Sequence, residues 1–236
     1  MEIVIHKADS RGAADYGWLK TQYSFSFSSW YNPERIHFGA LRVLNDDFID
    51  GGKGFGTHPH DNMEIITIPL SGQLEHKDSM GNTGIISKGE VQVMSAGTGI
   101  QHSEYNHNAD EPVTLFQLWV FPDKKNVTPR YDQRKFDFDS LKNSFLTILS
   151  PMGTPEGLNI HQNAWFHIGK MDKDFSTSYQ LIDKNNGVYV FVIEGDVDIN
   201  GNLLNRRDAI GIWEAEKIQM IASSSAEILL IEVPVQ

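Results

Sequence analysis

The sequence predicts an all-β protein made of two barrels. Short apolar runs recur along the whole chain, and glycine, asparagine and aspartate residues separate them. Many short strands at short spacing, with few helical periods, are typical of β-sandwiches and β-barrels. We expect strands over residues 38–44, 64–70, 114–120, 144–149, 188–193, 209–213 and 228–233. Helices should be few and short, with one expected near residues 139–143.

A weak internal repeat divides the chain into two halves. The segment IPLSGQLE at residues 68–75 resembles VIEGDVD at residues 192–198, and a turn containing glycine and asparagine follows each of them. Residues 122–139 are rich in charge and contain two prolines, which is typical of a connection between domains. We therefore predict an N-terminal domain over residues 1–130 and a C-terminal domain over residues 131–236.

Composition narrows the classes of function. The 236 residues include no cysteine, which excludes disulfides, thiolate metal ligands and cysteine nucleophiles. The net charge of −11 disfavours direct binding to nucleic acid or to an anionic membrane. No apolar run reaches the length of a membrane span, and no signal peptide is visible at the N-terminus. We expect a cytoplasmic protein.

Four residues of metal-binding type stand at strand spacing. His58 and His60 lie in GTHPHD, and His102 and Glu104 lie in IQHSEY. Residues two apart in a strand point to the same face, so each pair is directed at one point. If the two strands face each other, three imidazoles and one carboxylate converge. This ligand set suits a divalent transition metal such as Fe(II) and leaves room for water or substrate.

The second half lacks the residues for a similar site. No histidine follows His167. When the two repeats are aligned on their glycines, Leu181 and Asp183 take the positions of His58 and His60. We therefore expect the C-terminal barrel to be degenerate and to hold no metal.

These residues match two motifs of the cupin superfamily. The first, G-x5-H-x-H-x3,4-E-x6-G, matches at Gly52, His58, His60 and Glu64, with its last glycine displaced by one residue to Gly72. The second, G-x5-P-x-G-x2-H-x3-N, matches at Gly99, His102 and Asn106, while Gly97 stands at its proline position and Gly89 precedes the expected position of its first glycine by two residues. The resemblance implies two tandem cupin barrels, each a double-stranded β-helix or jelly roll.

The sequence resembles the pirin family of the cupins more closely still, in particular the bacterial pirin-like quercetin 2,3-dioxygenases. The segments GFGTHPHDNMEI, EHKDSMGN, MSAGTGIQHSEYN and TPRYDQRKF carry this likeness. It is dense from about residue 8 to residue 136 and looser towards the C-terminus.

The resemblance bears on which carboxylate would bind the metal. In many cupins the carboxylate belongs to the first motif, which corresponds to Glu64, and either glutamate could reach the inside of a barrel. In pirins it lies two residues after the third histidine, which corresponds to Glu104. We favour Glu104, which shares a strand face with His102. Glu64 is then expected beside the site or at the rim of the core.

The pirin resemblance implies a metal-dependent dioxygenase that cleaves a flavonol with O2 and releases CO. Fe(II) is the expected ion, with Cu, Ni, Mn, Co and Zn as alternatives, and Glu104 is the expected general base. The expected partners are a small aromatic substrate and O2, with neither nucleic acid nor membrane, in a monomeric protein. Two alternatives remain open: a redox-sensing regulatory protein that binds a protein partner, and a cupin dioxygenase acting on another small enediol.

The remaining candidates are expected to be structural. Six histidines lack partner spacing and are assigned to the fold: His6, His37, His76, His107, His161 and His167. Of these, His107 is an alternative candidate for the rim of the site. Asn106 is expected to orient a ligand or to close a turn. The run YSFSFSSWY at residues 23–31 alternates like a strand, and its rings are expected in the core, with Phe55 as a further candidate wall of a substrate pocket.

Overall fold

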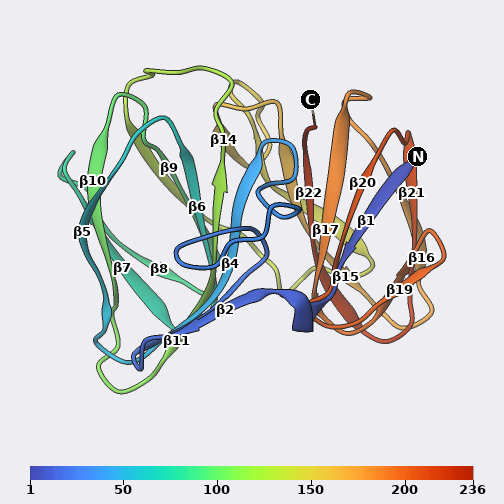
Figure 1. Cartoon of the computed structure of the whole chain (residues 1–236), viewed down its shortest axis with the longest axis horizontal. Coiled ribbons are helices and arrows are strands. Elements are labelled where there is room, and N and C mark those ends of the chain that lie inside the picture. The colour runs from blue at the N-terminus through green and yellow to red at the C-terminus, as the bar shows by residue number, and fades with distance from the viewer. Residues whose placement is uncertain (236) are drawn as a thin grey trace.

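Each half of the chain folds into two sheets, one of seven strands and one of four (Figure 1). The computed structural model describes residues 1–235. The two sheets of a half pack face to face, since Leu74 and Ile86 of the smaller N-terminal sheet share a buried cluster with Ile49 and Leu115 of the larger one. The prediction of an all-β protein with two barrels is therefore confirmed.

The N-terminal half is antiparallel throughout the strands described. From edge to edge, its larger sheet contains β12 (Arg130–Lys135), β9 (Glu90–Ser95), β6 (Glu64–Ser71), β11 (Val113–Val120), β4 (Leu41–Ile49), β3 (Leu19–Tyr23) and β2 (Gly12–Asp15). Its smaller sheet contains β5 (Gly54–His60), β10 (Ile100–Asn106), β7 (Gln73–Asp78) and β8 (Thr83–Ser87).

The C-terminal half repeats this plan, except that the last two strands at one edge of its larger sheet are parallel. Its larger sheet contains β1 (Glu2–His6), β20 (Ala209–Trp213), β17 (Asn186–Glu194), β22 (Ala226–Pro234), β15 (Trp165–Met171), β13 (Ser144–Pro151) and β14 (Leu158–Ile160). Its smaller sheet contains β16 (Ser176–Gln180), β21 (Lys217–Ala222), β18 (Val197–Ile199) and β19 (Asn202–Leu204). Strand for strand, β9, β6 and β11 correspond to β20, β17 and β22.

The edge strands of the two larger sheets come from unexpected parts of the chain. The position beside β9 is filled by β12, whereas the corresponding position beside β20 is filled by β1 from the opposite end of the sequence. Figure 1 shows β1, in blue, among the orange and red strands of the C-terminal half. Strand pairing thus places residues 2–6 with the C-terminal half and residues 130–135 with the N-terminal half. The division into 1–130 and 131–236 stays a prediction.

The repeated glycines make the same corner in both halves. Gly72 joins β6 to β7 with a φ of 70°, and Gly195 joins β17 to β18 with a φ of 79°. These backbone conformations favour glycine, because a β-carbon clashes there. At Gly195 such an atom would also lie 2.1 Å from the carbonyl oxygen of Ser225. The corner explains why the repeat is most visible around these two residues.

The two barrels meet through apolar side chains of their larger sheets. Ile66, Ile68 and Phe116 from the N-terminal half share one buried cluster with Phe191 and Leu229 from the C-terminal half. The rings of Phe116 and Phe191 lie 5.3 Å apart between their centroids. Because successive residues of a strand alternate between faces, β6 directs Ile66 and Ile68 to the interface and Thr67 into the N-terminal barrel.

Two local predictions are wrong. No helix forms near residues 139–143: Asp137 accepts a hydrogen bond from the backbone of Ser140 in a turn, and Asn143 adopts a φ of 50° that ends helical geometry. Within the described residues the one helical element is η1 (Ala8–Ser10), a 3-10 turn. Residues 24–31 are not a strand either, because Ser28 has a φ of 52° and a turn brings Phe27 and Trp30 together.

None of the helical structure described is long and apolar enough to cross a membrane.

Candidate metal centre

Strands β5 and β10 bring the three predicted histidines together. The two strands are antiparallel, and His58 stands directly opposite His102. His60 lies two residues further along the same face of β5. One ring nitrogen from each histidine lies within 4.8 Å of the other two. The ring centroids are 4.4 Å apart for His58 and His102, and 4.9 Å apart for His60 and either neighbour.

Burial and crowding keep two of these rings neutral. The pKa of His60 is lowered to about 4, first by burial and then by repulsion from His102 and His58. The pKa of His102 is lowered to about 3, first by burial and then by repulsion from His58 and His76. The Nε2 atom of His102 is buried and has no hydrogen-bond partner among the described residues. Neutral imidazoles with a free nitrogen are what a transition metal requires.

Glu104 forms a second group of potential ligands with His102 and His76. The pairing of β10 with β5 shifts between His102 and Glu104, so that Glu104 stands opposite Phe55. A carboxylate oxygen of Glu104 groups within 4.8 Å with nitrogens of His76 and His102, and that group does not contain His58 or His60. His102 is therefore the residue common to both groups of potential ligands.

Hydrogen bonds hold the Glu104 carboxylate in place. The side-chain amide of Gln117 donates to both of its oxygens, at 3.1 and 3.0 Å. The hydroxyl of Thr67 donates to one of them at 3.3 Å. Both partners come from the larger sheet, so Glu104 is held across the interior of the barrel. Only 3% of Glu104 is exposed to solvent, and an unpaired carboxylate at such a position would be costly.

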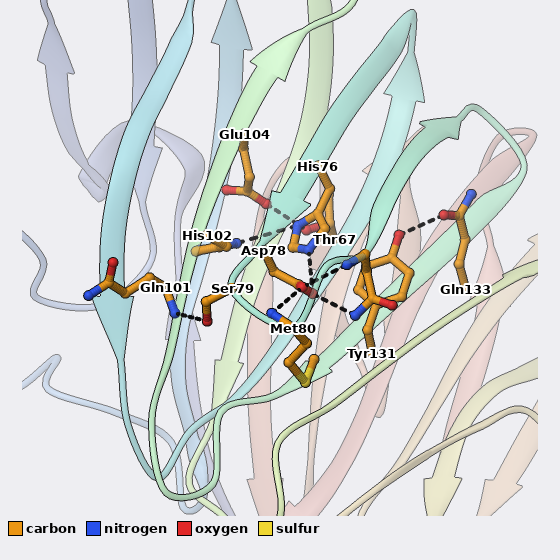
Figure 2. A network of polar contacts seen from close by, with 11 residues as sticks. Thr67, His76, Asp78, Ser79, Met80, Gln101, His102, Glu104, Tyr131 and Gln133 are labelled. Carbon is orange, nitrogen blue, oxygen red and sulfur yellow. Dashed lines mark hydrogen bonds and ion pairs between the residues drawn. The ribbon is translucent and has the colours of Figure 1, made fainter.

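His76, which the sequence analysis assigned to the fold, belongs to this site. It lies on β7 beside His102, and the Nδ1 atoms of the two rings are 3.5 Å apart (Figure 2). When Nε2 of His102 is free for a metal, its Nδ1–H can donate to His76, whose Nε2–H then donates to Asp78 at 3.2 Å. The ring of Tyr131 stacks on His76 at 4.7 Å between centroids.

A sequence signal for His76 existed. His76-Lys77-Asp78 has the same spacing as His102-Ser103-Glu104, with a histidine and a carboxylate two residues apart on one strand face. This spacing does not assign His76 to the site, because no sequence pattern indicates that β7 is the neighbour of β10.

Glu64 faces away from the candidate centre. It lies on β6 on the opposite face from Thr67, and Oε2 of its carboxyl accepts a hydrogen bond from Ser95 at 2.7 Å. Burial raises the pKa of Glu64 to about 7, against smaller opposing effects of Ser95 and of the backbone of His161 in the C-terminal half. The expectation that either glutamate could reach the inside of the barrel is therefore wrong, since strand alternation places Glu64 between the barrels.

The other assigned histidines lie outside both groups. His6 is hydrogen bonded to the Tyr189 hydroxyl at 2.9 Å, and His167 to the Tyr179 hydroxyl at 3.1 Å. His107 pairs with Glu75 at the surface, at 3.2 Å. Asn106 closes a turn, because its amide donates to three backbone carbonyls, those of Ile49, Asp50 and Glu111.

Comparison with known proteins agrees with this architecture. A family model described as Pirin matches residues 5–120, and one described as the quercetinase C-terminal cupin domain matches residues 147–233. The chain belongs to the pirin family. It is 43% identical to an Escherichia coli (strain K12) protein named quercetin 2,3-dioxygenase, across 98% of this chain and 99% of that protein. A Caulobacter vibrioides protein named pirin-like is 38% identical over 95% of this chain and 96% of its own length.

Solved structures of pirins resemble this one closely. The Escherichia coli bacterial pirin YhhW, crystallised in complex with nickel(II), superposes with a TM-score of 0.94 at 41% identity, and each chain is covered completely. A quercetin 2,3-dioxygenase from Acinetobacter baumannii shares the fold, with a TM-score of 0.79 at 20% identity over 98% of this chain and 86% of that chain. The predicted bicupin fold and membership of the pirin family are thus confirmed, and a single divalent metal is supported.

In the second barrel of this pirin, none of the five corresponding positions holds a histidine or a carboxylate. The two barrels can be aligned on Gly72 and Gly195. Leu74 and Val197, each two residues after its glycine, then correspond to each other. Their strand partners, Asn106 of β10 and Ala222 of β21, correspond as well. In the same alignment, the counterparts of His58, His60, His76, His102 and Glu104 are Tyr179, Leu181, Ile199, Ile218 and Met220, in that order. All five counterparts belong to one buried apolar cluster. The sequence alignment, which paired His58 with Leu181, was therefore two residues out.

Proposed function

We propose that this pirin is a dioxygenase of the quercetin 2,3-dioxygenase type, with its metal at His58, His60, His102 and Glu104. The observation that carries the proposal is the cluster of His58, His60 and His102, in which Nε2 of His102 is buried and unpaired, together with the buried carboxylate of Glu104 close to His102. Relatives that match the whole chain are named for this activity. The coarser inference, an oxidoreductase of the pirin type, follows from the same comparisons.

The proposed ion is Fe(II). Three neutral histidines and one carboxylate suit it, and they also suit nickel, copper, manganese, cobalt and zinc. YhhW, which was crystallised with nickel(II), has the same fold. A divalent ion bound here would supply Lewis acidity, which lowers the pKa of a coordinated hydroxyl group.

Glu104 is the proposed general base. Its carboxylate lies within 4.8 Å of a nitrogen of His102 and can accept the proton of a substrate hydroxyl bound beside that ring. Gln117 and Thr67 keep its oxygens directed into the barrel. The surrounding strands bury Glu104 and His102, which limits access of competing water to the reacting atoms.

The overall reaction balances without a further reductant. A flavonol and one O2 give a depside ester and one CO: both atoms of O2 enter the products, and two carbon–carbon bonds of the central ring are broken. The 3-hydroxyl proton, taken up by Glu104, is returned to the carboxylate product. The substrate and O2 are the proposed partners, in a cytoplasmic monomer whose metal-binding domain spans residues 1–130 and whose degenerate domain spans residues 131–236.

Oxygen consumption by the iron-loaded protein with quercetin tests this function. Uptake of O2 together with release of one CO per quercetin is expected. Glu104→Gln should retain metal, since three histidines remain, and should lose at least about 100-fold in turnover, as is usual when a general base is removed. Full activity of this variant would remove Glu104 as the base. Metal-bound protein inert towards flavonols and small enediols would instead favour the redox-sensing protein that binds a protein partner.

A further inference from the structure

A cavity of about 280 Å³, partly open to solvent, lies in the N-terminal barrel beside the candidate metal centre. We call it the Asp47 cavity. Its floor is formed by strands β3 and β4, and aromatic rings form its walls, among them Trp18, Tyr23, Phe27 and Phe55. None of the four proposed metal ligands lines it. Its volume is close to the lower limit for small-molecule sites and accommodates one aromatic ring better than a whole flavonol.

Three buried side-chain oxygens without hydrogen-bond partners among the described residues belong to Thr21, Asn45 and Asp47, which line this cavity. Oδ1 of Asn45 and Oδ1 of Asp47 are buried and unpaired among the described residues. Asn45 is 4% exposed and Asp47 is 6% exposed. The two residues are two apart on β4 and therefore share its inner face. Buried oxygens of this kind are costly to the fold, and a bound ligand that donates hydrogen bonds would satisfy them.

The cavity adjoins the proposed reaction centre through two aromatic contacts. The ring of Phe55 lies 6.4 Å from that of His58 between centroids. On the other side, Phe27 packs on Trp119 at 5.4 Å, and Trp119 packs on His60 at 4.9 Å. The pKa of Asp47 is raised mainly by its burial and, to a smaller extent, by the charge of Glu104. The cavity therefore lies next to His58 and His60, with the rings of Phe55, Phe27 and Trp119 between them.

The Oδ1 atoms of Asn45 and Asp47 indicate the chemistry of the ligand. Both are acceptors, so they select groups that donate, and the aromatic walls select a flat ring. We propose that the Asp47 cavity binds a hydroxylated aromatic ring of the substrate, whose O–H groups donate to Asp47 and Asn45. This inference rests on the proposed function and deepens it, because it assigns the specificity for hydroxyl groups remote from the metal to two residues.

Two flavonols test the assignment. Quercetin carries hydroxyl groups on its outer rings, and 3-hydroxyflavone carries only the group expected at the metal. With zinc-loaded protein under exclusion of oxygen, calorimetric titration should show quercetin binding about 10- to 100-fold more tightly than 3-hydroxyflavone. Each hydrogen bond to a buried oxygen contributes about this much when its loss leaves that oxygen unpaired.

The variants Asp47→Leu and Asn45→Leu should reduce this preference to about threefold or less. Asp46→Asn is the matched control, because it alters the neighbouring residue of β4, which faces away from the cavity and pairs with Arg11 at 3.2 Å and with Arg207 at 3.0 Å. The control should retain the preference. A second readout separates binding from folding: Asp47→Leu should leave the melting temperature of the metal-free protein unchanged or raise it, since it removes an unpaired buried group.

Equal affinity for both flavonols, absence of binding, or a preference that survives both leucine variants would overturn the assignment. A marked fall in melting temperature of Asp47→Leu, with the preference retained, would show that Asp47 serves only the fold. The proposed function is tested separately by oxygen uptake. If the preference is found without turnover, the dioxygenase proposal alone fails. If both flavonols are turned over equally well, the cavity assignment alone fails.

Discussion

At the position that His102 occupies in the N-terminal barrel, the C-terminal barrel has Ile218, and where Glu104 stands it has Met220. The strand order of the two barrels is the same, and the glycine corner after β6 and after β17 is the same. The interiors nevertheless differ. The first holds a cluster of imidazoles, a carboxylate and unpaired oxygens. The second has mostly aliphatic side chains, and its buried His167, Tyr179 and Glu232 are hydrogen bonded to one another. The comparison indicates that the second barrel is built mainly as a packed core, whereas the first places polar side chains in its interior to form the candidate metal centre.

Buried carboxyl groups show the same contrast. Glu232 in the C-terminal half accepts four hydrogen bonds: from the Tyr179 hydroxyl, from two backbone N–H groups at residues 182 and 183, and from the Asn186 amide. Asp47 in the N-terminal half has an unpaired oxygen, and burial raises its pKa to about 7. The second barrel satisfies its buried charge, as stable folds do, and the first leaves acceptors available.

The largest expected effects come from truncating the same position in each barrel. His102→Ala should reduce metal affinity by more than about 100-fold, beyond the range seen when groups outside the ligand set are changed. It should alter the stability of the metal-free protein little. Ile218→Ala should leave metal affinity unchanged and lower the free energy of unfolding by about 2–5 kcal/mol, because it opens a cavity in a packed core.

Chelator competition measures the affinities, and urea unfolding of metal-free protein measures the stabilities. The comparison between the barrels would break if Ile218→Ala weakened metal binding, or if His102→Ala left the metal content unchanged.

A smaller effect is expected for the ring behind His102. His76→Leu keeps the volume of the side chain but removes the acceptor for His102 Nδ1–H, and metal affinity should fall by about 10- to 100-fold. Its control is Ile199→Val, at the corresponding position of the C-terminal barrel, which should change only stability. If chelator competition gave wild-type affinity for His76→Leu, then His76 would belong to the fold, as the sequence analysis assigned it.

The smallest effect concerns the pH dependence of stability. The pKa of Glu64 is raised by burial to about 7 in the folded protein, whereas a carboxyl in the unfolded chain titrates near 4.5. The folded state therefore holds the proton more tightly, and its stability falls as the pH rises from about 4.5 to about 7. The loss due to Glu64 is at most about 3 kcal/mol. Asp47 contributes in the same direction.

Glu64→Gln should remove this part of the loss. Urea unfolding of metal-free protein between pH 5 and pH 8 should give a flatter profile for the variant than for the wild type. Profiles that run parallel would show that the Glu64 carboxyl is stabilised as an anion at the contact between the barrels.

Much of the fold was predictable because its determinants are local. Apolar runs with turn residues between them predict strands, and all seven predicted strands lie on or overlap observed ones. The predictions of a helix near residues 139–143 and of a strand through residues 24–31 were wrong. In each segment a single residue with positive φ, Asn143 or Ser28, changes the direction of the chain. The sequence signals for such residues are weaker than periodicity.

The pairs His58 with His60 and His102 with Glu104 follow from the sequence, since residues two apart on a strand must share a face. Which strands are neighbours became known from the three-dimensional fold. It placed His76 beside His102, turned Glu64 to the interface between the barrels, and put β1 at the edge of the C-terminal sheet. The physical reason is that side-chain alternation is a property of one strand, whereas the pairing of strands depends on burial and hydrogen bonding across the whole chain.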